Sequence, residues 1–255
     1  MQRSEITVSI VSGVYNEIGN IGKFVENLKN DEFVRCYPNL KKLILVDDGS
    51  TDGTLEAIKS MLSENLPFRI ILIERCTKFG LVDAFLTGSK DVDTEYTIFM
   101  DCDMQHPVSL IEKLIETAQN GFDIVVASRY VEGGGTDWSP LRGIISRCAI
   151  ALSWLILPGA KKIKDSTSGF FIVNTAMLRD LKKFPGFYKL LLYILSQNYE
   201  TSVAEVPFKI VGRKQGESKI VNHSFKFIIM YLKELLTYRF ESNKVRAHNL
   251  PERND

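Results

Sequence analysis

Short apolar runs alternate with amphipathic stretches through the first half of the chain. The apolar runs, rich in Ile, Val and Leu, predict buried strands at residues 6–17, 41–50, 69–74, 95–103 and 123–130. Apolar positions at helical spacing between them predict helices at residues 21–31, 52–62, 80–90 and 107–120. This alternation is typical of an α/β domain whose mostly parallel sheet is covered by helices on both faces.

The second half of the chain is less regular. The pattern predicts a glycine-rich loop, an apolar helix, a turn with a short strand, and an extended segment with a basic loop, at residues 131–143, 144–157, 165–174 and 202–219. The stretch at 223–240 is amphipathic, with one stripe formed by Phe225, Ile228, Ile229, Leu232, Leu235 and Leu236. We therefore expect one α/β domain at residues 1–222, followed by an amphipathic C-terminal helix and polar tail at residues 223–255.

Composition narrows the class of protein. A formal charge of +1 over 255 residues argues against a nucleic-acid-binding protein, which usually has a strong basic bias. The four cysteines (Cys36, Cys76, Cys102 and Cys148) include no CxxC pair, so we expect reduced thiols in the cytoplasm and no zinc framework. The first residues do not resemble a signal peptide, and no apolar run reaches the roughly 18 residues of a spanning helix.

Polar residues follow several of the predicted strands. In α/β sheets, ligands bind beyond the carboxyl ends of the strands. The motifs that fall there are Tyr15-Asn16-Glu17, Asp47-Asp48-Gly49-Ser50, Asp101-Cys102-Asp103 and Ser128-Arg129-Tyr130. We expect them to line a common site.

The segment "DCDMQHP" carries the most specific signal. In extended chain, side chains at i, i+2 and i+4 point to the same side, so Asp101, Asp103 and Gln105 would converge. Two nearby carboxylates repel, and an all-oxygen set suits Mg²⁺ or Mn²⁺, which commonly binds a diphosphate leaving group. The alternative is that the two aspartates cap the helix that follows.

Two further features suit a nucleotide. Asp48, at the end of a strand, can accept hydrogen bonds from a ribose or a base, although the dinucleotide G-x-G-x-x-G and P-loop patterns are absent. Arg213 and Lys219 flank Gly216 in a loop that can fold over a phosphate. Scattered surface cations are the alternative for these basic residues.

These residues also carry a resemblance. "VDDGSTDGT", "GLVDAFLTG", "DCDMQHP", "SRYVEGGG", "RGIISR", "DSTSGF" and "EVPFKIVGRKQGESK" resemble, in order, the family 2 inverting glycosyltransferases with the GT-A fold. The likeness is closest to the polyprenol-phosphate monosaccharide synthase branch and covers roughly residues 6 to 222. It implies that residues 1–222 are the catalytic domain.

The resemblance implies a role for each matching residue. Asp101, Asp103 and Gln105 would hold the metal and the donor diphosphate, with Asp101, Asp103 and Arg129 as the catalytic residues. The nucleotide site would comprise Gly13, Tyr15, Glu17, Val46, Asp48, Met100, Cys102 and, closing over the diphosphate, Arg213 and Lys219. Arg129, Arg142 and Ser146 would face the phosphate of the acceptor.

Three positions depart from the family pattern. Gly13 replaces a proline, Ser109 replaces a glutamate, and Phe171 replaces an arginine. The first two alter loop stiffness. Because Phe171 cannot supply a cation, the third leaves the identity of donor or acceptor open.

The implied reaction is transfer of a hexose from a nucleoside-diphosphate sugar to a polyprenyl (dolichyl) phosphate with inversion. The sequence does not fix the sugar or the base: mannose from GDP-mannose is our first assignment and glucose from UDP-glucose the second. A transferase with a soluble or polysaccharide acceptor, and a non-catalytic sugar-nucleotide-binding module, are the alternatives.

A lipid acceptor requires a membrane surface. Residues 148–157 and the stripe between Phe225 and Leu236 can lie in the membrane interface, or they can pack on the core or on another subunit. We expect peripheral binding at the cytoplasmic face, or anchoring by a partner subunit or by a region outside this sequence.

Overall fold

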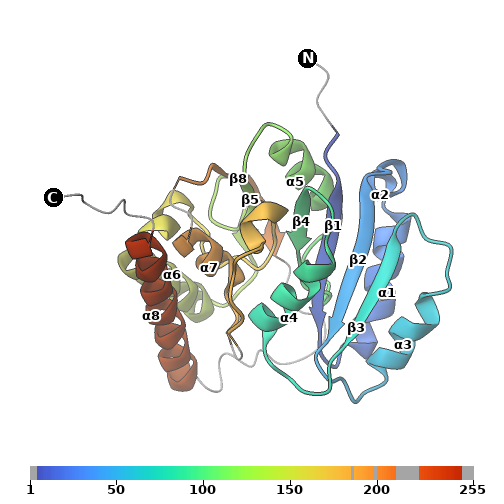
Figure 1. The fold of residues 1–255 in the computed structure, drawn as a ribbon, viewed down its shortest axis with the longest axis horizontal. Coiled ribbons are helices and arrows are strands. Elements are labelled where there is room, and N and C mark those ends of the chain that lie inside the picture. The colour runs from blue at the N-terminus through green and yellow to red at the C-terminus, as the bar shows by residue number, and fades with distance from the viewer. Residues whose placement is uncertain (1–4, 185–186, 198–199, 211–223, 249–255) are drawn as a thin grey trace.

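The computed structural model describes residues 5–184, 187–197, 200–210 and 224–248, and Figure 1 shows their arrangement. Its centre is a seven-stranded sheet of order β3-β2-β1-β4-β7-β5-β8. The strands are β1 (Val8–Val14), β2 (Leu40–Asp47), β3 (Arg69–Glu74), β4 (Tyr96–Phe99), β5 (Ile124–Ser128), β7 (Phe171–Asn174) and β8 (Val203–Pro207). The five strands predicted in the first half are confirmed, although the structure ends β1 and β4 before the polar residues that follow them.

One strand runs against the others. β7 pairs antiparallel with both β4 and β5, whereas the β1–β2, β1–β4, β2–β3 and β5–β8 pairs are parallel. The start of β7 therefore lies at the edge where β4 and β5 end. The turn before it, at residues 165–170, is thereby placed beside the polar residues that follow the parallel strands.

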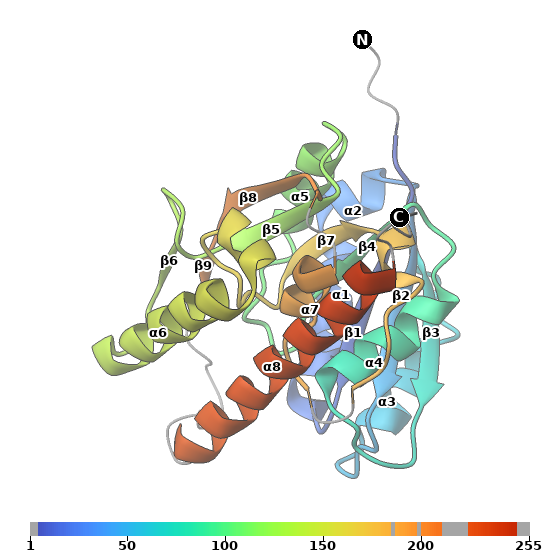
Figure 2. The same ribbon diagram turned by 60° about the vertical axis from the view of Figure 1, so that its left-hand side comes forward.

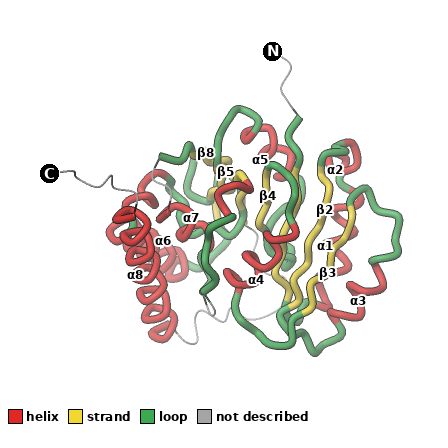
Figure 3. The backbone as a smooth tube through the Cα atoms, in the orientation of Figure 1, coloured by secondary structure: helices red, strands yellow, loops and turns green. Residues whose placement is uncertain are grey.

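Helices cover both faces of the sheet, as predicted (Figure 3). One face packs on α1 (Ile18–Asn30), α3 (Thr54–Met61) and α5 (Leu110–Ala118), and the other on α4 (Leu81–Gly88), α7 (Leu190–Gln197) and α8 (Ser224–His248). The sequence pattern did not reveal α7 or the short α2 (Glu32–Cys36). The remaining short elements are η1 (Ser89–Asp91), η2 (Pro158–Lys162) and η3 (Thr175–Leu178).

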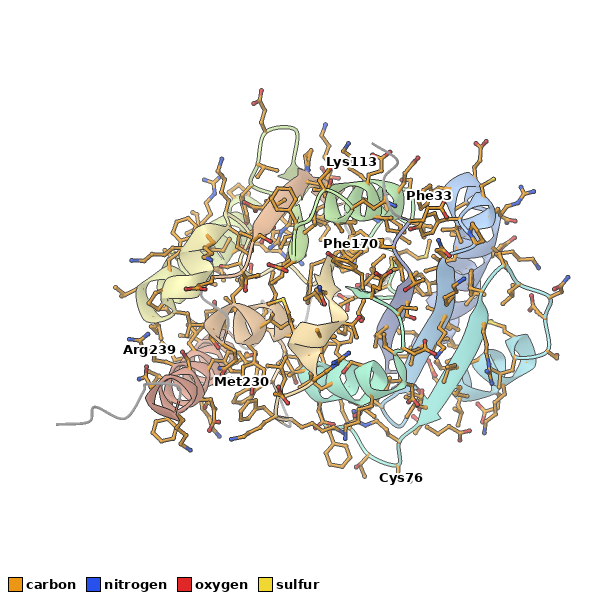
Figure 4. All side chains as sticks on the ribbon, turned by 45° about the horizontal axis from the view of Figure 1, so that its top comes forward. Phe33, Cys76, Lys113, Phe170, Met230 and Arg239 are labelled. Atoms are coloured by element: carbon orange, nitrogen blue, oxygen red, sulfur yellow. The ribbon has the colours of Figure 1, made fainter. Side chains whose placement is uncertain are left out.

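Two long helices lie at the end of the molecule opposite β3 (Figures 1 and 2). α6 (Pro140–Ile156) follows the glycine-rich loop. That loop contains β6 (Gly135–Thr136), which pairs in parallel with β9 (Lys209–Ile210) from later in the chain. α8 packs on α6 and α7, and the Tyr231 hydroxyl donates to the Ala149 carbonyl at 2.9 Å. Figure 4 shows Met230 and Arg239 of α8 at this border of the molecule and Phe170 near its centre.

The stripe predicted on the last helix faces two environments. Leu235 is fully buried, whereas Ile228, Ile229 and Leu236 are at least half exposed. Phe225 lies outside the residues whose side chains are described. The stripe is therefore partly core and partly surface.

Two expectations about cysteines and membranes can be compared with the structure. All four cysteines are free thiols, and Cys102 is the buried one. Within the described part of the chain, no helix combines the length and apolar character that crossing a bilayer requires.

Candidate active site

Segments that adjoin five strands meet at one edge of the sheet. Residues 15–17, 48–50, 100–106 and 129–130 follow β1, β2, β4 and β5, and residues 165–170 precede β7. This edge is where the predicted polar motifs were expected to gather. The domain boundary at residue 222 falls in the segment 211–223, outside the described residues, and stays a prediction.

The acidic segment is a turn and not an extended strand. β4 ends at Phe99, Met104 has a positive φ of 65°, and the Gln105 N–H donates to Asp103 Oδ1 at 3.1 Å. The expectation that Asp101, Asp103 and Gln105 converge by strand alternation is therefore wrong in its geometry. They are instead neighbours within one tight turn.

His106 fixes this turn to the core. It is buried, its Nδ1 accepts the Asp101 N–H at 2.9 Å, and its ring stacks on Phe170 at 5.0 Å. Burial lowers the pKa of His106 to about 4, against the opposing charge of Asp103. His106 is thus a neutral hydrogen-bond acceptor that holds the turn in place.

The turn fits a hard divalent cation. Its side-chain donors are two carboxylates and an amide oxygen, and Mg²⁺-type sites use one or two carboxylates completed by water and substrate phosphates. A Cβ at Gly169 would lie 3.7 Å from Asp101 Oδ2, so the absence of a side chain there keeps space beside that carboxylate. No group of three His, Cys, Asp or Glu side chains that could hold a metal occurs in the described residues, so a cation at this turn would need substrate oxygens or water as further ligands.

The expected nucleoside side lies around the ends of β1 and β2. The Lys78 ammonium lies 3.7 Å from the centre of the Tyr15 ring, and Glu17 Oε2 accepts from the Asn20 amide at 2.7 Å. The side chains of Val46, Met100 and Cys102 are buried in the sheet layer. These three can contact a ligand only through their backbone.

Two residues of this predicted set already have structural roles. Gly13 packs against α4, because a Cβ there would lie 2.9 Å from Leu81 Cδ1. Asp48 accepts the N–H groups of Phe79 and Gly80 at 3.1 and 3.2 Å and pairs with Arg75 at 3.2 Å. Asp48 therefore fixes the loop between β3 and α4, a role that its position in the motif did not indicate.

The three residues expected at the acceptor are brought together around two aromatic rings. The guanidinium carbons of Arg129 and Arg142 lie 4.9 and 4.0 Å from the centre of the Trp138 ring. The Tyr130 hydroxyl bonds to Ser146 Oγ at 2.9 Å. The Trp138 indole N–H is buried and has no hydrogen-bond partner among the described residues, so this cluster offers a donor as well as cations.

A buried carboxylate holds Arg129 in this cluster. Asp165 accepts from Arg129 Nε at 2.7 Å and from Nη2 at 2.6 Å, while Nη2 also donates to Thr167 Oγ1 at 3.0 Å. Burial lowers the pKa of Arg129, but the bonds and charge of Asp165 outweigh it, so the pKa is raised. Arg129 is a permanently charged, oriented cation.

Lys189 is a further cation at this edge, and the sequence reasoning missed it. Its ammonium donates to the Thr167 carbonyl at 3.0 Å. Burial and then the charge of Arg129 lower the pKa of Lys189, while the charges of Glu234, Asp165 and Asp101 oppose this. The missed residues Trp138, Asp165 and Lys189 share no spacing signal, although "DSTSGF" does contain Asp165.

The other two predicted cations, Arg213 and Lys219, lie in the segment 211–223, outside the described residues. Their placement over a diphosphate stays a prediction.

Comparison with known proteins shows which family the chain resembles. The sequence profile of the family described as glycosyl transferase family 2 matches residues 9–182. The chain is 33% identical over 239 residues to a dolichol-phosphate mannosyltransferase of Pyrococcus furiosus, covering 93% of this chain and 66% of that protein. It is 31% identical over 258 residues to a dolichol-phosphate mannosyltransferase of Saccharomyces cerevisiae, covering 94% of this chain and 91% of that protein.

Solved glycosyltransferase structures share the fold. A glucosyl-3-phosphoglycerate synthase from Mycobacterium tuberculosis, in complex with Mn²⁺, UDP and glucosyl-3-phosphoglycerate, superposes with a TM-score of 0.64 at 17% identity, covering 94% of this chain and 81% of that chain. A mannosyltransferase from Pyrobaculum calidifontis, in complex with GDP-Man and Mn²⁺, gives a TM-score of 0.61 at 14% identity, covering 94% and 64%. At these identities the likeness concerns the GT-A fold alone.

Proposed function

This chain belongs to glycosyl transferase family 2, and on that premise we propose that it transfers mannose from GDP-mannose to dolichyl phosphate, with inversion and with Mg²⁺ or Mn²⁺ as cofactor. The relatives named above are dolichol-phosphate mannosyltransferases, which favours mannose and guanosine over glucose and uridine. The proposal assigns the donor to the acidic turn and the acceptor phosphate to the cluster around Trp138.

One observation carries the proposal. Arg129, Arg142 and Ser146 come from two separate segments, and they meet around Trp138 and Tyr130 at the edge that also holds the acidic turn. Two arginines, a hydroxyl and an indole N–H suit a phosphate monoester, because guanidinium groups bind phosphate oxygens through charge-assisted hydrogen bonds. A neutral sugar hydroxyl as acceptor would not need this much positive charge.

The chemistry then needs positioning more than proton transfer. The acceptor phosphate is already an anion, so one of its oxygens can attack the anomeric carbon without a protein base. The new O–C bond forms as the bond from the anomeric carbon to the nucleoside diphosphate breaks, and the electron pair leaves with the diphosphate. In-line attack inverts the configuration at that carbon.

The protein's residues supply alignment and charge. Arg129, fixed by Asp165, and Arg142, stacked on Trp138, would orient the attacking phosphate. Asp101, Asp103 and Gln105 would hold the divalent cation, which when bound stabilises the charge that develops on the departing diphosphate.

A lipid acceptor also requires contact with a membrane, and α6 has a surface that suits it. Apolar exposed positions recur along this helix at alternating intervals of three and four residues, and they are Leu141, Ile144, Cys148, Ala151 and Leu155. Pro140 and Arg147 are the other exposed residues of α6. Leu155 is 79% exposed and Leu141 62%. Because Arg142 is on the same helix, a lipid tail leaving the acceptor cluster would run along this apolar stripe.

We therefore place the protein peripherally at a membrane, on its cytoplasmic face, since four free thiols suit a reducing compartment. The surface residues Ile229, Leu236 and Phe240 of α8 would extend the apolar contact, since each is more than half exposed.

The direct test of the reaction is an extraction assay. Radiolabelled GDP-mannose and UDP-glucose are each incubated with the protein, Mn²⁺ and dolichyl phosphate in detergent, and the organic phase is counted. We expect label from GDP-mannose in the organic phase. Label that stays in water-soluble product, or that comes from UDP-glucose alone, would refute the assignment of acceptor or donor respectively.

The membrane contact has its own test. Flotation with phosphatidylcholine vesicles that contain dolichyl phosphate compares wild type with the pair Ile144→Asp and Leu155→Asp. The control is Leu62→Asp, a 47% exposed leucine at the end of α3. We expect the α6 variant alone to remain with the unbound fraction, and equal flotation of all three proteins would place the anchor elsewhere.

A further inference from the structure

A single carboxylate on the C-terminal helix reaches the segment that precedes α7. Glu234 is 2% exposed, and its Oε1 accepts the N–H groups of Tyr188 and Lys189 at 3.0 and 2.6 Å. The same oxygen accepts the Tyr238 hydroxyl at 2.8 Å. Glu234 therefore fixes the backbone of residues 188–189 to α8.

That backbone directs Lys189 to the candidate active site. The Lys189 ammonium donates to the carbonyl of Thr167, and Arg129 donates to the hydroxyl of the same residue, each at 3.0 Å. The ammonium also interacts electrostatically with Asp165 and with Asp101 of the acidic turn. Gly169, in the same turn as Thr167, lies beside Asp101, because a Cβ there would be 3.7 Å from Asp101 Oδ2. Lys189 and Arg129 are thus two cations bound to the turn that borders a proposed metal ligand.

The two cations Lys189 and Arg129 would be stabilised by an anion bound next to them. Asp165 uses both of its oxygens to bind Arg129, so it offers Lys189 only longer-range attraction. Two cations attached to one threonine repel each other, and a half-buried ammonium is costly unless it is paired. A phosphate oxygen placed between them would remove both penalties.

We propose that Lys189, beside Arg129 at Thr167, binds a phosphate oxygen of the substrate, and that Glu234 is the residue that positions it. The inference rests on the proposed function for the presence of a phosphate at this edge. The phosphate belongs either to the donor diphosphate or to the acceptor monoester, and the experiment below separates these sources.

Binding, not turnover, is the first readout, so that the result does not depend on the reaction assigned. Affinity for GDP with Mn²⁺ is measured by calorimetry, and affinity for dolichyl phosphate by titration in detergent. Lys189→Met should weaken one of the two by about ten-fold or more, the usual effect of losing a charge-assisted hydrogen bond. Lys189→Arg, which keeps the charge, should restore most of that affinity.

A matched control is available a few residues earlier in the chain. Lys182, whose side chain is exposed, pairs with Glu241 of α8 at 2.9 Å, so Lys182→Met also removes a lysine that bridges to this helix. It should leave both affinities unchanged. For Lys189→Met, loss of affinity for GDP would assign Lys189 to the donor diphosphate, and loss of affinity for the lipid would assign it to the acceptor.

The positioning role of Glu234 is tested by combining substitutions. Glu234→Leu should weaken the same ligand as Lys189→Met, and the double variant should be no weaker than Lys189→Met alone, because both remove one interaction. Glu234→Gln keeps an oxygen for the two N–H groups and should bind nearly normally. Additive losses in the double variant would overturn the positioning role.

The remaining outcomes are also decisive. If Lys189→Met leaves both affinities intact, Lys189 only balances the neighbouring carboxylates and the proposal fails. If wild type binds both ligands and Lys189→Met weakens one, but no sugar reaches the organic phase, the binding role stands and the proposed function fails.

Discussion

The guanidinium of Arg129 and the carboxylate of Asp165 face each other through two hydrogen bonds, at 2.7 and 2.6 Å, and the Arg129 backbone N–H bonds to the same carboxylate at 3.0 Å. Asp165 is completely buried, and its own N–H donates to Glu205 at 3.0 Å. This pair joins the end of β5 to the turn before β7. Its geometry makes the cation part of the scaffold before any substrate binds.

Asp165→Asn should therefore destabilise the fold as well as the site. It would leave a buried arginine without its counter-charge, a change that costs about 3–5 kcal/mol in comparable buried pairs. Urea denaturation followed by circular dichroism measures the loss. Asp180→Asn, on an exposed carboxylate, is the control and should stay within about 0.5 kcal/mol of wild type. A loss for Asp165→Asn no larger than that of the control would show that the pair is not structural.

Arg142 is the cleaner probe of the acceptor, because it stacks on Trp138 from a partly exposed position on α6, whereas Arg129 is bound to the buried Asp165. Arg142→Ala should weaken the polyprenyl phosphate by about 1.5–3 kcal/mol, the typical contribution of a hydrogen bond to a charged group, and leave the nucleoside diphosphate nearly unaffected. The lipid is titrated in detergent and the nucleotide by calorimetry. A loss of nucleotide affinity instead would assign Arg142 to the donor side.

Asp103→Asn tests the acidic turn. Asparagine keeps an oxygen for the Gln105 N–H, so the turn should survive while the charge at the cation is lost. The transfer rate should fall about 10²-fold or more at saturating Mn²⁺, with little change in unfolding temperature. A residual rate above about a third of wild type would exclude Asp103 as a metal ligand, since loss of a ligating charge has a larger effect.

The sequence predicted the first five strands, their strand-end motifs and the covering helices other than α7, because each of these depends on local periodicity. Arg129, Arg142 and Ser146 were predicted as acceptor residues from the family resemblance, and the structure brings them together around Trp138 and Tyr130. What local periodicity cannot reveal is the antiparallel insertion of β7, which carries Asp165 and Thr167 to the site from a distant part of the chain.

The features that the sequence predicted wrongly or did not reveal have similar physical causes. The turn at Asp101–Gln105 was taken as extended chain because an apolar strand precedes it, whereas the positive φ of Met104 reverses the backbone. Lys189 begins an apolar stretch that gives no helical period, since α7 is buried on all sides. Its role depends on Glu234, 45 residues later, and such a pairing has no signature in either segment.

Replacing a glycine by alanine should change the unfolding free energy in opposite directions in two of the helices. At Gly88, in α4, a Cβ would lie 2.6 Å from Val11 Cγ1 and 3.0 Å from Val46 Cγ2. Both valines are fully buried and β-branched, so neither can move aside easily. Gly88→Ala should cost about 1–3 kcal/mol of unfolding free energy through overpacking, even though alanine is the better helix former.

Gly143, in α6, provides the comparison, because a Cβ there meets nothing within 4 Å. Gly143→Ala should stabilise by about 0.5–1 kcal/mol through helix propensity and the reduced entropy of the unfolded chain. Chemical denaturation of the two variants measures both changes. If both variants were stabilised, the side chains around Gly88 would be able to move enough to accommodate the added methyl group.

The pH dependence of stability provides a test of Glu234 that is independent of activity. Burial raises the pKa of this carboxyl, although the N–H groups of Lys189 and Tyr188, the Tyr238 hydroxyl and the charge of Lys189 oppose the change. Because the folded pKa lies above that of the unfolded chain, about 4.3, the folded protein binds this proton more tightly. Its contribution to stability is fully present below a pH of about 4.3 and is lost as the pH rises through the folded pKa.

Glu234→Gln has no proton to lose in this range, so its stability should not decline for that reason. The unfolding free energy of the glutamine variant, minus that of wild type, should therefore increase as the pH is raised from about 4 toward neutrality. Each tenfold tightening of proton binding by the folded protein corresponds to about 1.36 kcal/mol of this increase. Thermal and urea denaturation of both proteins across this range measure the difference, and Glu26→Gln, on an exposed carboxyl of α1, serves as the control. A difference that stays constant with pH would mean that Glu234 has the same pKa in the folded and the unfolded chain. A difference that decreases with pH would mean that the attraction of Glu234 to Lys189 affects its pKa more than its burial does.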